Sequence, residues 1–206
     1  MPLMATALTT VAQAKAHLSI TASDSSQNAR LELFINAATS RIETMTDRKL
    51  KERTHVEYRS GKRSNEVMLL QYPVSSIIEL SRDNESIFPS SSIISPSQYA
   101  LDASSSSVVL LKDVFPSGIR NIKVTYVAGY NETDHPGNLA ELEICCLWIV
   151  EWFYKHRERG DMGRTQKSKG DESVGILAEM PKMISEMILQ YKRIEMPLAD
   201  RMIEQL

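Results

Sequence analysis

The chain has 206 residues, enough for one domain with an embellishment or for two small domains. Its 42% apolar and 24% charged residues are ordinary for a globular protein and argue against a disordered or collagenous chain. Basic and acidic residues nearly balance, with a formal charge of −2, so any contact with nucleic acid must come from a local patch.

The sequence gives no indication of membrane insertion or secretion. The longest apolar run, Ile144–Val150, is far too short to span a bilayer. No apolar stretch follows a charged N-terminal start, so we expect a chain that stays in the cytoplasm of the cell that makes it. The only two cysteines, Cys145 and Cys146, are adjacent in a helical pattern and read as small core residues rather than as a disulfide pair.

Two helices are predicted in the N-terminal region. Thr9 or Thr10 can cap a short helix over Val11–Leu18. Asp24 and Gln27 resemble a capping box before a second helix that ends near residue 48. Its apolar residues recur at helical spacing, which is the pattern of an amphipathic helix with one buried face.

The middle of the chain changes to a two-residue period, which indicates strands. We expect a hairpin loop at Ser60–Lys62 and further turns near Asp83 and Pro116, giving a small antiparallel β unit. The predicted strands are Arg53–Arg59, Glu66–Tyr72, Ser76–Ser81, Gln98–Asp102, Val108–Lys112 and Ile119–Val127.

Helical periodicity returns in the C-terminal region after Pro136, which suits a first helical turn. From Lys155 to Gly170 the chain is polar and contains several glycines, so we expect a loop there. Pro181 opens a last amphipathic helix, which Pro197 ends.

These elements predict an α+β fold, in which the N- and C-terminal helices form a helical bundle with an inserted small antiparallel β unit. The expected divisions are residues 1–52 for the N-terminal helices, 53–130 for the β insertion, and 131–206 for the C-terminal helices, the basic loop and the tail.

Motifs for catalysis or cofactor binding are absent from the sequence. Neither a phosphate-binding glycine loop nor a dinucleotide fingerprint occurs, and the four histidines are not spaced as metal ligands. The glutamates of the third helix point in different directions, and no convergent set for a small hydrolase can be assembled. We therefore predict no enzyme, no catalytic residue, no metal and no cofactor.

Two C-terminal features indicate contact with a partner. Basic residues gather between positions 155 and 169, where they can neutralise phosphates or form a merely solvated loop. Six of the ten methionines lie from position 162 onward, and such flexible side chains suit docking on another protein as well as core packing. A small nucleic-acid-binding regulator that uses the basic loop 155–169 is therefore an alternative function.

Several segments, in the same order, resemble the head-to-tail connector or adaptor proteins of long-tailed bacteriophages and related prophages. Asp47 departs from the family pattern, which has a glycine there, and the serine-rich stretch 79–107 is longer than in compact members. The similar segments are LFINAATSRIE at 33–43, TDRKL at 46–50, YPV at 72–74, VTYVAGY at 124–130, YKHRE at 154–158, Met180–Pro181, and QYKR at 190–193.

The resemblance implies a structural virion protein in the neck, at the head-tail interface. Such proteins form a homo-oligomeric ring, usually of twelve copies, between the portal protein and a stopper or tail-completion protein, and extend the channel for passing double-stranded DNA without sequence specificity. It implies portal contacts at Met183, Met187, Tyr191, Lys192 and Arg193. We expect a subunit interface at Trp148 and Trp152. Residues that face either DNA or the portal would be Lys155, Arg157, Arg159, Arg164, Lys167 and Lys169.

Overall fold

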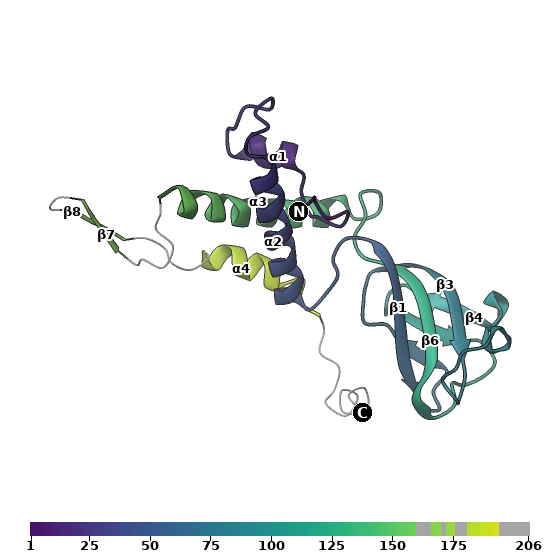
Figure 1. Cartoon of the computed structure of the whole chain (residues 1–206). Helices are drawn as coiled ribbons and strands as arrows, with labels where there is room; N and C mark the ends of the chain where they lie inside the picture. The colour runs from purple at the N-terminus through teal and green to yellow at the C-terminus, as the bar shows by residue number, and fades with distance from the viewer. Residues whose placement is uncertain (160–165, 170–171, 176–180, 194–206) are drawn as a thin grey trace. The chain divides into compact units, whose positions relative to one another are not determined.

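The computed structural model describes residues 1–159, 166–169, 172–175 and 181–193 and has an α+β fold (Figure 1). The chain divides into two compact units. A helical unit contains Met1–Asp47 and His135–Lys192, and a β unit contains Arg48–Asp134. The β unit is therefore an insertion between two halves of the helical unit.

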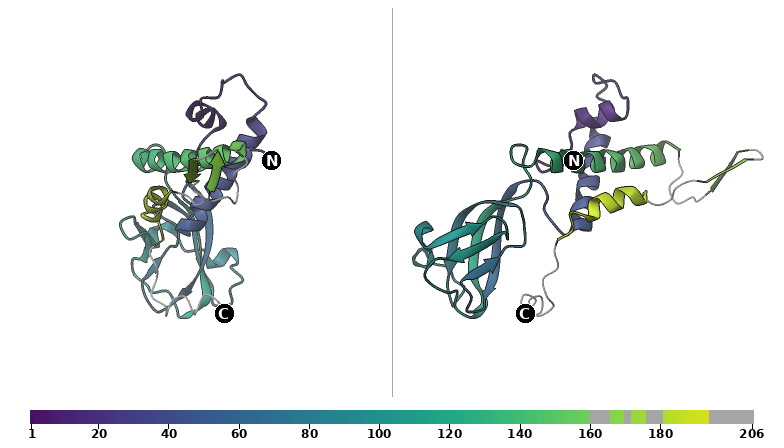
Figure 2. Two further views of the ribbon diagram at one scale, coloured as in Figure 1. Left: turned by 90° about the vertical axis from the view of Figure 1, so that its left-hand side faces the viewer. Right: turned by 180° about the vertical axis from the view of Figure 1, so that it is seen from behind.

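Four helices make up the described core of the helical unit: α1 (Val11–His17), α2 (Asn28–Thr46), α3 (Pro136–Arg159) and α4 (Lys182–Leu189). Both α2 and α3 pack against the other three. In Figures 1 and 2, α2 runs across α3 rather than along it. The buried residues Leu31, Ile35, Ala38 and Ile42 form one face of α2, as helical periodicity predicts.

The ends of the first two helices differ in how well the sequence predicts them. Thr10 caps α1 in a capping box, because its hydroxyl accepts the Gln13 N–H at 3.2 Å while its own N–H donates to the Gln13 side chain at 2.9 Å. The predicted box at the start of α2 is wrong, since the Asp24 carboxylate accepts the N–H of Ser26 in a local turn instead. Asp47 ends α2 in the left-handed conformation that the family's glycine would take.

The N-terminal segment is held across α2 by two polar side chains. The Asn36 amide accepts the Met4 N–H at 2.9 Å and donates to the Pro2 carbonyl at 3.0 Å. One turn further on, the Thr39 hydroxyl accepts the Leu8 N–H at 3.2 Å. Because the backbone groups of this segment find partners on α2, residues 2–8 belong to the packed unit.

All six predicted strands of the β unit are confirmed, with some change in their ends, and they form two three-stranded antiparallel sheets. One sheet has the order β1-β6-β3 and the other β2-β5-β4. The strands are β1 (Arg53–Gly61), β2 (Glu66–Met68), β3 (Val74–Arg82), β4 (Tyr99–Asp102), β5 (Ser107–Leu110) and β6 (Gly118–Ala128), with short 3-10 turns at Ser90–Ser92 and Pro96–Gln98.

The predicted hairpin at Ser60–Lys62 is wrong, because β1 pairs with β6 and β2 lies in the other sheet. The chain crosses between the sheets after Gly61, where the backbone runs against the Pro116 carbonyl. A Cβ at Gly61 would lie 1.9 Å from that oxygen, so no other residue fits there without a shift of the backbone.

Both sheets contribute to one hydrophobic core in the β unit. Phe115 and Tyr126 are its largest fully buried side chains. The cluster comprises Val67, Leu69, Val74, Leu80, Ile94, Val108, Leu110, Phe115, Ile122, Val124, Tyr126 and Ala128. The β unit therefore has a core of its own, distinct from the helical face described above.

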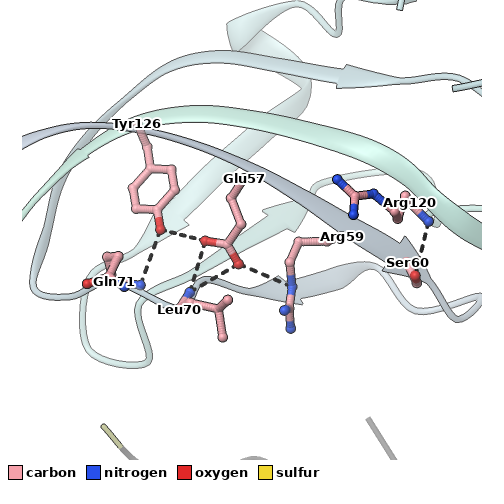
Figure 3. Close-up of polar contacts among 7 residues, drawn as sticks. All are labelled: Glu57, Arg59, Ser60, Leu70, Gln71, Arg120 and Tyr126. Atoms are coloured by element: carbon pink, nitrogen blue, oxygen red, sulfur yellow. Dashed lines mark hydrogen bonds and ion pairs between the residues drawn. The ribbon is translucent and has the colours of Figure 1, made fainter. Parts of the chain in front are cut away.

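A buried carboxylate fastens the segment after β2 to the larger sheet (Figure 3). Glu57 on β1 accepts the Tyr126 hydroxyl proton at 2.6 Å and the Leu70 N–H at 3.1 Å, and Arg59 lies 3.4 Å away. The Tyr126 oxygen in turn accepts the Gln71 N–H at 3.2 Å. Burial and the nearby Glu57 charge raise the pKa of Tyr126 well above its ordinary value, so the phenol stays a donor.

The two passages of chain that enter and leave the β unit run side by side. Tyr130 donates its N–H to the Leu50 carbonyl at 2.7 Å and accepts the Glu52 N–H at 3.0 Å. The Arg48 guanidinium stacks 3.5 Å above the Tyr72 ring and also lies over the Tyr130 ring. The insertion is thus closed at its base by backbone pairing and by a buried cation.

The structure corrects three further predictions in the C-terminal region. Residues 155–159 continue α3, because Lys, Arg and Glu favour a helix and none of these five residues is a glycine. Residues 166–169 (β7) pair with residues 172–175 (β8), so the stretch 155–169 is not a single loop. The last helix ends at Leu189, followed by a turn at Gln190–Tyr191, whereas Pro197 lies outside the described residues.

Two leucines on α2 test the buried face of the helical unit. Leu31→Ala should lower the free energy of unfolding by about 2–5 kcal/mol, because Leu31 is fully buried and its truncation leaves a cavity. Leu33→Ala is the matched control: Leu33 is 51% exposed, and its loss should cost no more than about 0.5 kcal/mol. Urea unfolding followed by helical circular dichroism measures both, and equal losses would refute this assignment of the core.

Removing one hydroxyl tests the Glu57 cluster of the β unit. Tyr126→Phe should cost about 1–3 kcal/mol, because it leaves the buried Glu57 carboxylate one donor short. Tyr99→Phe in the same unit is the control, since no hydrogen bond joins the Tyr99 hydroxyl to any described residue. Thermal unfolding of the β unit measures both, and a Tyr126→Phe variant as stable as the native chain would contradict the role given to the cluster.

Candidate functional site

The described residues contain no cluster of metal-ligating side chains. No group of three or more His, Cys, Asp or Glu side chains in this part of the chain is placed to hold a metal ion. None of the described helices is long and apolar enough to cross a membrane. The sequence predicts three surfaces as candidate functional sites.

The first surface is the predicted portal contact on and after α4, and its five residues differ in how exposed they are. Met183 and Lys192 are exposed, whereas Met187 and Arg193 are half-buried. Tyr191 is only 5% exposed, so in this conformation its ring packs inside the helical unit. Exposed surface for a partner therefore lies mainly at Met183 and Lys192, together with the neighbouring Leu189, which sequence analysis does not single out.

Tyr191 has an anchoring position between α4 and α3. Its hydroxyl donates to the Glu141 carboxylate and accepts the Asn138 amide at 3.4 Å, and the Gln190 amide also donates to Glu141. The buried Ile184 and Ile188 give α4 its apolar face towards the unit. These contacts orient α4 so that Met183 and Leu189 face outward.

The second surface contains the predicted subunit-interface tryptophans of α3, which are both half-buried. Trp152 lies in an aromatic cluster, 4.4 Å from the His156 ring and 5.4 Å from the Phe153 ring between centroids. Trp148 follows the exposed Ile144 by one helical turn. Ile144 and Trp148 therefore form an apolar strip on α3 that remains accessible in the single subunit.

The cysteines lie on the opposite, buried side of α3. Burial raises the pKa of Cys145 to about 11 and that of Cys146 to about 12. The Cys146 sulfur lies 3.9 Å from the Thr39 hydroxyl of α2. Both thiols therefore stay protonated and unreactive near neutral pH, which confirms that they are core residues.

The third surface is the predicted basic stretch 155–169, of which the structure describes residues 155–159 and 166–169. Lys155 forms an ion pair with Glu151 one turn earlier on α3, and His17 of α1 reaches the same carboxylate at 2.8 Å. Lys155 and His17 together hold the pKa of Glu151 below its ordinary value. Arg157 is exposed on α3, Arg159 ends that helix, Lys167 and Lys169 belong to β7, and Arg164 lies outside the described residues.

Sequence analysis misses the exposed apolar surface of the β unit. Val56 and Tyr58 on β1 face away from the core, and Ile87 and Ile119 are more exposed still. Arg120 lies 5.2 Å from the Tyr58 ring and Phe88 lies 5.6 Å from it, so an aromatic and cationic cluster accompanies the aliphatic residues. A period of two marks Val56 and Tyr58 as sharing a face, but it does not tell which face is covered.

Comparison with known proteins identifies chains that share this fold. Three solved structures share the fold over nearly their whole length. The neck of a native GTA particle computed with C12 symmetry has a TM-score of 0.62 and 16% identity, covering 97% of this chain and 98% of that one. The neck of an empty GTA particle computed with C6 symmetry gives 0.62 and 17% over the same shares. The virion of a native gene transfer agent particle gives 0.60 and 17%, covering 96% and 95%.

Searching the curated proteins gave no match. The head completion protein family, in contrast, matches residues 7–194, which is nearly the whole chain. This match confirms the resemblance to head-to-tail connector proteins that the sequence motifs indicate. The chain belongs to the head completion protein family.

Proposed function

We propose that the chain is the subunit of an adaptor ring in the neck of a virion. Twelve copies would stand between the portal protein and the stopper or tail-completion protein and would extend the channel for DNA. The family match over residues 7–194 carries the proposal. The C12 symmetry of a neck structure with the same fold supports the ring and its copy number.

The distribution of exposed apolar side chains fits a subunit that is completed by neighbours. Met183 and Leu189 on α4, Ile144 on α3 and Ile87 in the β unit are all exposed in the single chain. A closed ring covers such surfaces by joining one patch to a different patch on the next copy. In this proposal, the helical unit is the body of the ring, the strip at Ile144 and Trp148 contributes to the subunit contact, and α4 meets the portal.

The charge of the chain fits a channel through which DNA moves. Each phosphate that a protein neutralises adds to affinity, so many such contacts would hold the DNA in place. The formal charge of −2 and the pairing of Lys155 with Glu151 limit these contacts. Lys155 and Arg157 are both exposed on α3, and we propose that Arg157 can face passing DNA or the portal.

The alternative function, a nucleic-acid-binding regulator, depended on a basic loop over residues 155–169. Of that stretch, the structure describes residues 155–159 at the end of α3 and the strand β7. A regulator of this kind would bind DNA as a single chain with a steep dependence on salt concentration.

Imaging of the assembled neck tests the ring. We expect cryo-electron microscopy of the purified chain mixed with its cognate portal to reveal a twelvefold ring of this chain on the portal. The portal alone, imaged in the same buffer, is the control. A chain that stays monomeric beside the portal, or that instead shifts DNA in a gel without any portal complex, would refute the adaptor function.

Two methionines of similar exposure test the portal contact. Met183→Asp should weaken binding to the portal about tenfold or more, because a charge replaces an apolar contact. Met183 is the second residue of α4, where an acidic side chain favours the helix, so the fold should persist. Met68→Asp on β2 is the control with matched exposure, 50% against 56%. Equal binding of Met183→Asp and the native chain in a portal pull-down would exclude Met183 from the contact.

A further inference from the structure

The loop that follows β3 is built around the carboxylate of Asp83. This carboxylate accepts three backbone N–H groups, from Glu85 at 3.1 Å, from Ile87 at 2.9 Å and from Phe88 at 2.8 Å. Ser86 and Phe88 both have positive φ angles, 57° and 55°, which are costly for residues with a Cβ. Such backbone strain persists only where the surroundings determine it, and it often marks a functional surface.

Contacts on its other side fix the same loop. The Ser86 hydroxyl donates to the Arg120 carbonyl at 3.2 Å, and the Phe88 ring packs against Tyr58. Ile87 lies between these two anchors and is 72% exposed, close to the highest exposure of any large apolar residue in the described chain. The loop therefore presents an isoleucine rigidly to the outside, where a single copy offers it no cover.

A cavity of about 270 Å³ opens elsewhere on the β unit. Its apolar wall consists of Ile94, Leu110 and Leu111, and Lys112 also lines it. The rest of the lining is polar and consists of Arg82, Ser97, Gln98 and Asp113. The volume exceeds the roughly 150 Å³ that is enough for benzene, so an isoleucine side chain can enter and meet the apolar wall.

The loop that carries Ile87 and the cavity have side chains of opposite charge. Glu85 lies two residues before Ile87, and Lys112 lines the cavity. Both side chains are exposed, and neither forms an ion pair with another described residue. A contact that inserts Ile87 into the cavity of another copy would bring a negative side chain towards a positive one.

Ile87 and the cavity have different neighbours in the β unit. Ile87 accompanies Phe88, which packs on Tyr58, a residue on the outer face of the β1-β6-β3 sheet. The cavity instead lies where the end of β3 approaches the residues that follow β5, and the Arg82–Asp113 ion pair forms part of its lining. Ile87 cannot enter the cavity of its own chain, because Asp83 and Arg120 hold the loop in its place.

We propose that Ile87 of each copy inserts into this cavity of the next copy in the ring, with Glu85 facing Lys112 of that copy. The contact is heterologous, because a protruding loop on one side meets a cavity on another, and such contacts repeat around a closed ring. The inference rests on the ring assembly proposed above and adds a second subunit interface, within the β unit.

Cross-linking between engineered cysteines tests the contact. Particles are prepared with a chain that carries Ile87→Cys and Ser97→Cys, since Ser97 lines the cavity, and are treated with a short bifunctional maleimide. The native cysteines are buried and should not react. We expect a ladder of covalent multimers of this chain on a denaturing gel, up to the full ring. Each single-cysteine variant should give no ladder.

The outcomes separate this inference from the proposed function. Rings that are visible by electron microscopy but give no ladder would overturn the loop-to-cavity contact and leave the adaptor function intact. A cross-link from Ile87→Cys to a different neck protein would also overturn it, because another partner would then cover the loop. Necks that contain no ring of this chain would overturn both.

Charge reversal provides a second measurement that needs no cysteine. Glu85→Lys alone and Lys112→Glu alone should each lower incorporation of the chain into rings about tenfold, because each sets like charges against each other. The double variant should restore incorporation. Glu66→Lys, an exposed glutamate on β2, is the matched control and should incorporate normally. Failure of the double variant to exceed either single variant would contradict the pairing.

Discussion

The closure of the β insertion at its base is the constraint on which the rest of the structure depends. The helices α2 and α3 pack together although the whole β unit separates them in sequence. Backbone pairing between Tyr130 and residues 50–52 brings the two ends of the insertion together. The stacking of Arg48 on Tyr72 and Tyr130 desolvates a cation that water would otherwise hydrate, and the π-faces of the two rings compensate for part of that loss.

This closure lowers the entropic cost of a long insertion. A flexible loop of that length would have to be ordered before α2 and α3 could meet, although the cost of closure grows only slowly with length. The β unit has its own core around Phe115 and Tyr126, so it can form locally and present its two ends already paired. The Glu57 cluster serves the same purpose, because it ties the chain between β2 and β3 to the sheet that carries β1 and β6.

Local patterns in the sequence predict most elements of this fold, and they fail where partners are distant. The two-residue period locates all six strands, and helical spacing locates the buried face of α2. The pairing of β1 with β6 is not predicted, because register depends on residues far apart in the chain, and Gly61 shows its role only against the Pro116 carbonyl. Glu57 reads as an ordinary polar residue in a strand, since nothing nearby in sequence reveals that Tyr126 and Leu70 will bury it.

The candidate surfaces show the same limit. The apolar residues of α4 are visible in the sequence, but their division into the buried Ile184 and Ile188 and the exposed Met183 and Leu189 follows from the anchoring of Tyr191 on Glu141. The sequence shows the positive charges of residues 155–169 but not the partners of those charges. In the structure, α3 extends to Arg159, and Lys155 pairs with Glu151 on the same helix.

The single chain leaves large apolar side chains exposed beside its charged ones, and this has a consequence for assembly. Ion pairs between exposed charges weaken as salt is added, whereas the burial of aliphatic side chains does not. A ring held through residues such as Ile87, Ile144 and Met183 would therefore keep its contacts over a wide range of ionic strength. In the proposed ring, the acidic residues that balance the basic ones would also weaken the hold of the chain on the DNA backbone, so the same charge balance would suit a channel through which DNA moves.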